Sequence, residues 1–132
     1  MPDVNWLAVL LCGISSMVLG GIWYSPLLFA KRWMAGAKLS EADLQGANMG
    51  LIYGLAFLLS LIAALAFAIF LGRGMPLEPA LAAGAGTGIC FVAASFGISY
   101  LFERRSLGHW LINGGYHALQ FTLFGLILGL MQ

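Results

Sequence analysis

Residues 44–72 read LQGANMGLIYGLAFLLSLIAALAFAIFLG and contain no charged side chain. An α-helix needs about 20 apolar residues to cross about 30 Å of hydrocarbon, so this stretch is long enough to span a bilayer. Three further uncharged runs, residues 4–30, 79–102 and 106–132, meet the same condition. The sequence therefore predicts an all-α, polytopic membrane protein. We expect a single transmembrane domain of residues 1–132, a bundle of four transmembrane helices at about residues 4–26, 42–72, 78–102 and 107–131.

The composition of the chain agrees with a membrane environment. Of its 132 residues, 61% are hydrophobic and 8% are charged, whereas about a quarter of an ordinary soluble domain is charged. The six basic residues are scattered and do not form the basic face that a nucleic-acid partner requires. Cys12 and Cys90 lie in apolar runs and are expected to be buried thiols, not a disulfide. We expect the lipid bilayer as the surroundings and no nucleic acid as a partner.

Basic residues are concentrated on one side of the predicted spans. Lys31, Arg32 and Lys38 follow the first helix and Arg104 and Arg105 the third, whereas Arg73 alone lies on the other side. Because positively charged loops are retained in the cytoplasm, we expect both termini on the periplasmic side of a bacterial inner membrane. Aromatic and basic side chains near these loops should anchor the chain at the headgroup level. The predicted anchors are Trp23, Tyr24, Lys31, Arg32, Trp33, Arg104 and Arg105.

The loop between the first two predicted helices is long enough to hold structure of its own. Pro26 should end or kink the first helix, because proline clashes with the preceding turn. Residues 27–38 are then expected to form a short interfacial segment, with Phe29 and Trp33 facing lipid and the basic side chains facing headgroups.

The second predicted helix starts with a capping signal. Ser40 precedes Asp43 by three residues, which is the spacing of a capping box with Asp in place of the usual Glu. We therefore expect the helix over residues 42–72 to begin in the cytoplasm, before it enters the bilayer.

Small residues recur at four-residue intervals along two of the predicted helices. Such stripes let helix backbones approach closely in lipid, where packing drives association. They comprise Gly46, Gly50 and Gly54 on the second helix and Gly84 and Gly88 on the third, and the third stripe continues to Ser95 and Ser99. We expect these faces to pack within the chain or against a second chain, which predicts a homo-oligomer or a partner in a membrane complex.

The fourth predicted helix carries a stripe of polar residues. These residues, His109, Asn113, Tyr116, His117 and Gln120, occur at i, i+4, i+7, i+8 and i+11, within about 100° of one helix face. His117 lies about ten residues into the helix, or roughly 15 Å deep at 1.5 Å per residue. Ionisable groups at that depth are costly, and by default they mark a functional site. The alternative interpretation is that the stripe holds helices together by hydrogen bonds.

Several kinds of chemistry are disfavoured at this stripe. A metal site needs three or four converging ligands, and a hydrolytic site needs an oriented nucleophile and base, so we expect no metal, no cofactor and no catalytic residue. A polar stripe suits the binding or passage of a proton, an ion or a small solute. Two alternatives stay open: a structural or accessory subunit of a larger membrane complex, and a haem- or pigment-binding protein with His117 as an axial ligand.

Two short motifs link the chain to a known family. Residues 23–31 read WYSPLLFAK and are followed by Trp33, and residues 113–117 read NGGYH. Over essentially its whole length the chain resembles the bacterial membrane-protein family called domain of unknown function 1761. The resemblance implies a small integral membrane protein and carries over no catalytic residue, substrate or cofactor.

Overall fold

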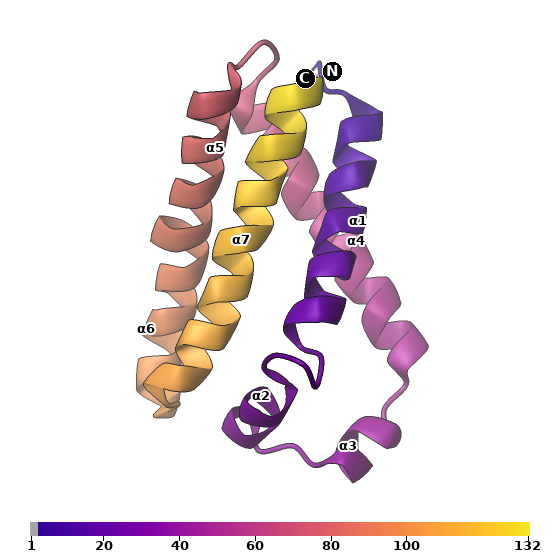
Figure 1. Cartoon of the computed structure of the whole chain (residues 1–132), viewed down its shortest axis with the longest axis vertical. Coiled ribbons are helices and arrows are strands. Elements are labelled where there is room, and N and C mark those ends of the chain that lie inside the picture. Colours follow the sequence, from indigo (N-terminus) through magenta and orange to yellow (C-terminus); the bar gives the residue numbers. More distant parts are fainter. Residues whose placement is uncertain (1–2) are drawn as a thin grey trace.

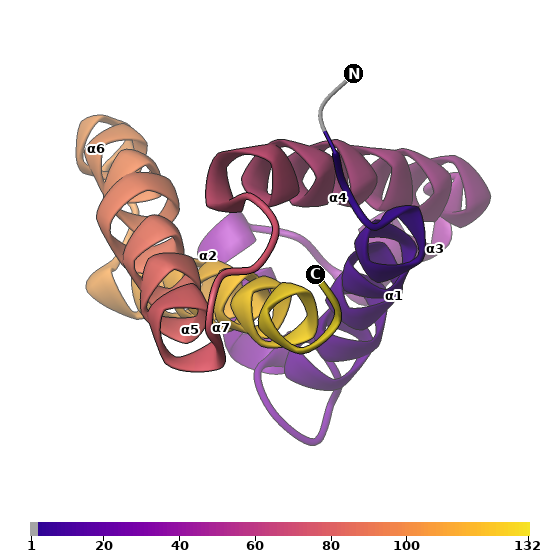
Figure 2. The ribbon, with the colours of Figure 1, turned by 90° about the horizontal axis from the view of Figure 1, so that it is seen from above.

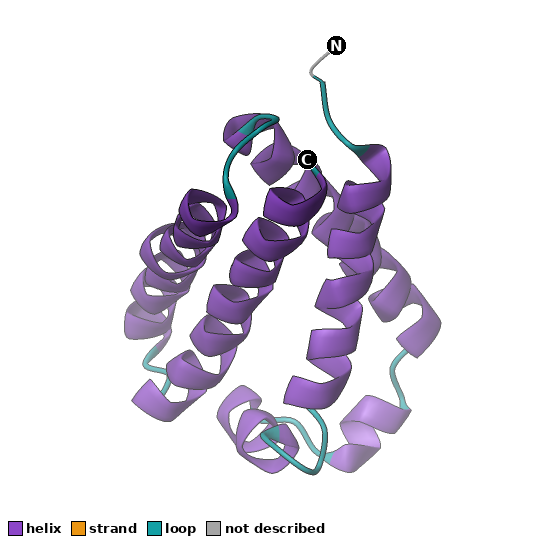
Figure 3. Cartoon of the chain, turned by 45° about the horizontal axis from the view of Figure 1, so that its top comes forward, coloured by secondary structure: helices purple, strands orange, loops and turns teal. Residues whose placement is uncertain are grey.

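The computed structural model describes residues 3–132, and every regular element in that range is helical (Figure 3). In chain order these are α1 (Trp6–Trp23), α2 (Ala30–Ala37), α3 (Glu41–Gln45), α4 (Met49–Leu71), α5 (Leu77–Gly86), the π-helix η1 (Thr87–Ala93), α6 (Ala94–Glu103) and α7 (Leu107–Met131). Because α5, η1 and α6 follow one another directly, they form one long helix, Leu77–Glu103.

Four helices are long and apolar enough to cross a membrane: α1, α4, the long helix Leu77–Glu103, and α7. Their outward side chains are apolar and exposed; Phe70 and Phe102, for example, are 89% and 87% exposed. A surface of this kind is unfavourable in water and matches the hydrocarbon of a bilayer. The predicted fold class, an all-α polytopic membrane protein with four spanning helices, is therefore confirmed.

The spans are arranged around α7. Figure 2 shows α7 between α5 and α1, with α4 lying across the same side of α1 and α7. The helix α7 packs against α1, α5, η1 and α6, whereas α4 packs mainly on α1. Both termini lie at one end of the molecule, here called the terminal end, and α2 and α3 lie at the other (Figure 1). We call that second end the basic end, because five of the six basic residues belong to it.

The predicted second helix, residues 42–72, is wrong in one respect, because it is two helices. The capping box is present: the Ser40 side chain accepts from the Asp43 N–H, and the Asp43 carboxylate accepts from the Ser40 N–H. However, this box starts only the short α3, whose C-cap is Gly46. A new helix, α4, begins at Met49, because the side chain of Asn48 accepts a hydrogen bond from the Leu51 N–H at 3.1 Å.

The segment between the first two spans also differs from the prediction in detail. It contains the helix α2, which turns back beneath the bundle and contacts α7. The ring of Phe29 lies 4.8 Å from that of Trp23, and the ring of Trp33 lies 5.6 Å from that of Tyr24. Phe29 and Trp33 therefore pack on the aromatic residues at the end of α1, a contact that the sequence pattern does not reveal, and both stay half exposed. That their exposed sides face lipid stays a prediction.

The terminal end contains the apolar core. Phe124 and Leu128 of α7 are 0% and 1% exposed, and the ring of Phe67 on α4 meets that of Phe121 at 5.8 Å, edge to face. Cys12 is buried in this cluster as expected. The expectation that Cys90 is buried is wrong, because its position on η1 places it on the outer side of the long helix.

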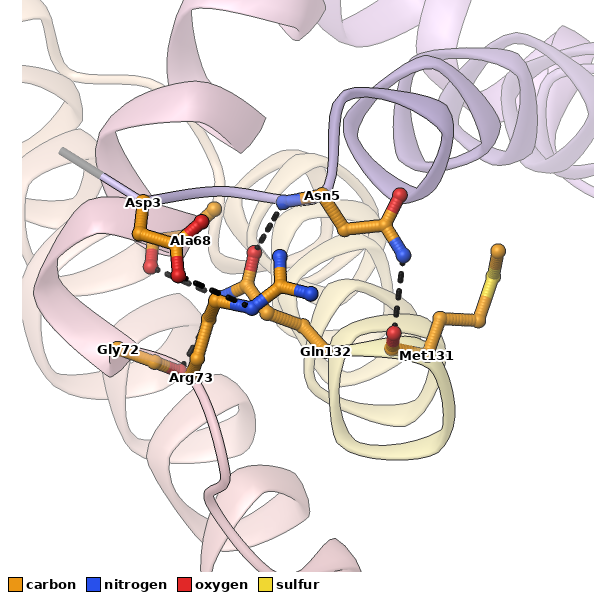
Figure 4. Close-up of polar contacts among 7 residues, drawn as sticks. All are labelled: Asp3, Asn5, Ala68, Gly72, Arg73, Met131 and Gln132. Carbon is orange, nitrogen blue, oxygen red and sulfur yellow. Dashed lines mark hydrogen bonds and ion pairs between the residues drawn. The ribbon is translucent and has the colours of Figure 1, made fainter. Parts of the chain in front are cut away.

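Polar groups close the terminal end (Figure 4). The Gln132 side chain accepts from the Asn5 N–H at 2.9 Å and donates to the carbonyls of Ala68 and Gly72 at 3.2 and 3.1 Å. The Asn5 amide nitrogen donates to the Met131 carbonyl at 2.9 Å. The bonds to Gly72 and Met131 satisfy carbonyls at the ends of α4 and α7, where helical partners run out. Together these bonds tie three of the four spans to one another.

Candidate functional site

The five polar residues predicted on the last helix all lie on the inner side of α7. His109 and Gln120 are buried, and Asn113, Tyr116 and His117 are half-buried. They form two groups, one at the basic end and one near the middle of α7. The rings of Tyr24 and Tyr116 join the groups through an edge-to-face contact at 5.5 Å. The structure thus brings all five residues into one polar region.

Asn113 is the centre of the first group. Its side-chain oxygen accepts a hydrogen bond from the Tyr24 hydroxyl at 2.6 Å, and its nitrogen donates to the Tyr100 hydroxyl at 2.8 Å. The same nitrogen lies 3.2 Å from Nε2 of His109. One residue of α7 therefore connects α6 with the end of α1.

The bonds of Asn113 assign the tautomer of His109. An amide nitrogen only donates, so Nε2 of His109 must accept, and in the neutral ring the proton is on Nδ1. His109 is 5% exposed, and Nδ1 is the one buried side-chain nitrogen or oxygen within residues 3–132 that has no hydrogen-bond partner. A buried donor without an acceptor is costly, and in a native structure it indicates a functional constraint or an absent ligand.

The helix α2 covers this imidazole. A Cβ atom at Gly36 would overlap Nδ1 of His109, so the glycine backbone lies directly on the ring. The carbonyl of Gly36 accepts a hydrogen bond from the Arg105 guanidinium at 2.7 Å. Position 36 has to be small because backbone and ring are in contact, and Arg105 fixes α2 in that position.

The second group joins α7 to α1. The Tyr116 hydroxyl donates to the Ser16 carbonyl at 2.8 Å, and the Gln120 amide donates to the Ser16 hydroxyl at 2.9 Å. Nδ1 of His117 lies 2.7 Å from the Gln120 side-chain oxygen, and the His117 ring stacks on Phe96 at 5.0 Å. Ser16 is fully buried. This group has the features of interhelical hydrogen bonding in a membrane helix pair.

The π-helix η1 determines which residues of the long helix face α7. Small residues meet α7 at Gly84 and Gly88, and the next buried position is Ala93, five residues later. The extra residue of the π-turn shifts the register, so that Phe96 and Tyr100 point to the polar region. The predicted continuation of the stripe to Ser95 and Ser99 is therefore wrong, and both serines are exposed.

The predicted glycine positions have two different surroundings. A Cβ at Gly84 would overlap the Phe121 carbonyl, and one at Gly88 would lie 2.6 Å from the His117 carbonyl, so both glycines allow the long helix to contact α7. Gly54 has no other atom within 4 Å of such a Cβ, and Gly50 and Gly46 meet only atoms of nearby residues in the sequence. Gly46, Gly50 and Gly54 therefore make no contact between helices of this chain.

The predicted interfacial anchors all lie at the basic end. Trp23 donates its indole N–H to the Ile112 carbonyl at 2.8 Å, and Tyr24 and Trp33 contact one another as described above. Tyr24 is thus part of the polar region, a role that its position near the end of the first predicted helix does not indicate. Burial raises the pKa of the Tyr24 hydroxyl above its ordinary value, and the neighbouring Tyr116 and Tyr100 raise it further. The Tyr24 hydroxyl therefore stays a neutral donor.

A cleft of about 1000 Å³ opens at the basic end, between α2 and the turn from α6 to α7. Four predicted anchors line it, Trp23, Arg32, Arg104 and Arg105, and His109 forms part of its floor. Lys31 is an exposed residue of α2 and is not among the lining residues. The cleft is the solvent-side approach to the polar region.

Sequence reasoning missed several residues of this region. These residues are Ser16, Gly36, Phe96 and Tyr100. Ser16 and Phe96 lie in apolar segments, where the local pattern does not show which side chains face inward. A signal for Gly36 and Tyr100 is their place beside basic turns, which the topology brings to the same end of α7.

The fold and the polar region define the chain as a multi-pass integral membrane protein whose last spanning helix makes an internal hydrogen-bond network. Comparison with known families gives a match over residues 7–129 to the family described as "Protein of unknown function (DUF1761)". The chain belongs to this family, as its two short motifs predict. No curated protein and no solved structure matches it.

Proposed function

We propose that this protein binds a proton or a small polar solute at His109, in the half of the bundle next to the basic end. The observation that carries the proposal is the unpartnered Nδ1 of His109, in a region where Asn113, Tyr24 and Tyr100 are hydrogen-bonded to one another. In the neutral ring the free Nδ1 carries the proton and can donate it to a ligand, whereas a second proton would enter at Nε2 and would require the Asn113 amide to turn away. The proposed role is binding and not catalysis.

The geometry of α7 favours binding over passage through a single chain. Beyond Gln120, the inner face of α7 consists of Phe121, Phe124 and Leu128, which are packed in the apolar core. Thr122 donates to a carbonyl of its own helix at 2.7 Å and adds no polar group to the interior. A proton or ion that enters from the cleft would therefore meet an apolar barrier in the terminal half.

The position of α2 controls access to the imidazole of His109. Access from the cleft to Nδ1 requires α2 to move away from the ring, since Gly36 lies on it. The helix α2 is eight residues long and has no buried residue, and it is held by the guanidinium bond from Arg105 and the ring contact of Trp33 with Tyr24. An element with few buried contacts opens at low free-energy cost. We propose that α2 is a movable cover of the site.

The proposed orientation places the site on the cytoplasmic side of a bacterial inner membrane, with both termini outside. The basis is the excess of basic residues at the end that holds α2 and the turn between α6 and α7.

Histidine-selective nuclear magnetic resonance tests the proposal, because the chain has only two histidines. A sample labelled with nitrogen-15 in histidine, in lipid nanodiscs, is recorded over a pH series, and His117→Gln assigns the two ring signals. We expect His109 to carry its proton on Nδ1 in the neutral ring and to protonate reversibly, together with changes in the amide signals of α2. A His109 ring that keeps one protonation state throughout the folded range and shows no solvent exchange would overturn the proposal.

Proteoliposomes with an enclosed pH dye separate binding from passage. With a potassium gradient as the driving force, we expect the wild-type protein to carry no more proton current than His109→Gln. A proton flux that is present in the wild type and lost in His109→Gln would replace binding with passage. His117→Gln is the matched control, because it changes the other imidazole and keeps hydrogen-bonding capacity.

A second candidate role is self-association or a place in a larger membrane complex. The half of α4 near the basic end is exposed, and Gly50 and Gly54 lie on it with no helix of this chain against them. Gly84 and Gly88 show how this protein uses such spacing, since both let backbones meet within the chain. We propose that the Gly50 and Gly54 face of α4 packs against a second copy.

A further inference from the structure

The cleft at the basic end has an unbalanced charge. Arg32, Lys38, Arg104 and Arg105 line it, and Glu103 is the one acidic residue of the lining. Glu103 forms an ion pair with Arg105 at 3.5 Å. Arg105 also donates to the Gly36 carbonyl, so this cation already has two partners. Within residues 3–132, Arg32, Lys38 and Arg104 have no carboxylate at ion-pair distance. Three cations are therefore available to a ligand.

Two of these cations occupy an unusual backbone conformation. Lys38 has φ of 60° and Arg104 has φ of 59°, and they are the only non-glycine residues with positive φ in the described part of the chain. Each ends a helix in the left-handed conformation, α2 and α6 respectively, where glycine is strongly preferred. At the terminal end the chain does use glycine for positive φ, at Gly72 and Gly74. The side chains of Lys38 and Arg104 are thus kept at a conformational cost, and both line the same cleft.

The rest of the cleft determines what kind of anion fits. Its inner wall is apolar, with Trp23, Phe29 and Ile112 on the side that continues into the spanning region. The indole of Trp23 is fixed by its bond to the Ile112 carbonyl. The N-terminus of α7, a helix of 25 residues, adds its positive end at Ser106 and Gly108. A cationic rim above an apolar wall complements a molecule with an anionic head and an apolar tail.

We propose that this cleft binds the phosphate of an anionic membrane phospholipid, with Arg32, Lys38 and Arg104 around the phosphate and the acyl chain along Trp23 and Phe29. Basic pockets between spanning helices recognise lipid headgroups in this way. The site is distinct from the imidazole site of the proposed function, because the ring nitrogen of His109 lies beneath Gly36 and not at the rim.

Native mass spectrometry of the whole protein, released from detergent micelles, tests this proposal. Dioleoylphosphatidylglycerol, dioleoylphosphatidylcholine or inorganic phosphate is added to wild-type protein and to the double variant Lys38→Asn, Arg104→Asn. Asparagine tolerates the left-handed conformation and removes the charge, so helicity and thermal stability should be retained. We expect the wild type to keep the glycerol lipid in preference to the choline lipid, and the double variant to lose that preference on the order of tenfold.

The controls keep this proposal separate from the imidazole site. Arg73→Asn removes the cation at the terminal end, which lies 3.4 Å from Asp3, and should leave lipid retention unchanged. His109→Gln should also leave it unchanged, even if the proton-binding proposal fails. Should the double variant fail to fold, Lys38→Gly and Arg104→Gly are tested one at a time, since glycine relieves the backbone cost. Equal retention of both lipids by the wild type, full retention by the folded charge variants, or displacement of the lipid by inorganic phosphate alone would overturn the proposal.

Discussion

Gly36 of α2 lies against the imidazole of His109, so that a methyl group added at position 36 would overlap Nδ1 and Cγ of the ring. The ring cannot swing aside freely, because Nε2 is held by Asn113 at 3.2 Å. This contact couples the position of a short peripheral helix to a buried ionisable group of a spanning helix. It is therefore the most direct place to test whether α2 is a cover.

Gly36→Ala should lift α2 from the bundle. The overlap is expected to cost about 1–3 kcal/mol, which exceeds the gain in helix propensity of about 1 kcal/mol. Hydrogen–deuterium exchange of residues 30–37 should become faster, while exchange in α7 beyond His117 stays slow. Gly21→Ala is the control, since a Cβ at Gly21 has no other atom within 4 Å. Equal exchange of α2 in the wild type and Gly36→Ala would contradict the proposed cover.

The cap of α3 should weaken in acid. The backbone N–H of Ser40 donates to the Asp43 carboxylate at 2.8 Å and the Ser40 hydroxyl does so at 2.9 Å, and these bonds lower the pKa of Asp43 below its ordinary value. Since the folded pKa is depressed, the stabilisation is present above the unfolded pKa of about 3.9 and is lost as the pH falls through the folded value. Amide exchange in α3 should accelerate over that range, and Asp43→Asn should remove the pH dependence.

The four spans and the polar face of α7 could be predicted, because both depend on local properties. A spanning helix requires only length and apolar composition. The face shared by His109, Asn113 and Gln120 follows from the period of the α-helix alone. For the same reason the bounds predicted for the last helix, residues 107–131, agree with α7, whose N-cap Ser106 accepts from the His109 N–H.

The remaining features depend on contacts between distant residues. The π-turn of η1 shifts the register by one residue, so that Phe96 and Tyr100, and not Ser95 and Ser99, lie on the inner face. No residue pattern in the sequence signals this extra residue in a helical turn. The docking of α2 depends on Arg105, which is 69 residues from its partner Gly36 in the chain. An amphipathic segment read in isolation is placed in the interface by default, so its inward contacts were missed.

The orientation can be measured by cysteine accessibility. Lys38→Cys lies at the basic end and Arg73→Cys at the terminal end, and both wild-type residues are exposed. With Cys12 and Cys90 replaced by alanine, an impermeant maleimide added to intact cells should label position 73 and leave position 38 unlabelled until the cells are opened. Labelling of position 38 in intact cells would reverse the proposed orientation.

The two glycine faces should respond differently to a large side chain. Gly84→Leu drives the long helix from α7, because even a Cβ overlaps the Phe121 carbonyl, and should destabilise the monomer by 3 kcal/mol or more, on the order of a severe core overpacking. Gly54→Leu meets no atom of this chain. It should leave thermal stability in detergent unchanged and reduce the oligomer fraction in cross-linking and light scattering. An unchanged oligomer fraction in Gly54→Leu would mean that this face contacts lipid.

Gln120 and Ser16 should be energetically coupled. The Gln120 amide donates to the Ser16 hydroxyl at 2.9 Å, and its oxygen lies 2.7 Å from Nδ1 of His117, which must therefore carry the proton in a neutral ring. Gln120→Leu leaves a buried hydroxyl and an imidazole N–H unmatched, which costs about 1–3 kcal/mol. Ser16→Ala alone leaves the Gln120 amide nitrogen without the hydroxyl that accepts its hydrogen bond.

The double variant removes both partners, so its cost should be smaller than the sum of the single costs. In membrane proteins such coupling averages about 0.6 kcal/mol and reaches about 1.7 kcal/mol. Reversible unfolding in mixed micelles measures it, with Thr122→Val as the control, because Thr122 donates only to a carbonyl of its own helix. Additive costs of Ser16→Ala and Gln120→Leu would show that this pair does not hold α1 and α7 together. The polar groups near His117 would then require an explanation other than interhelical hydrogen bonding.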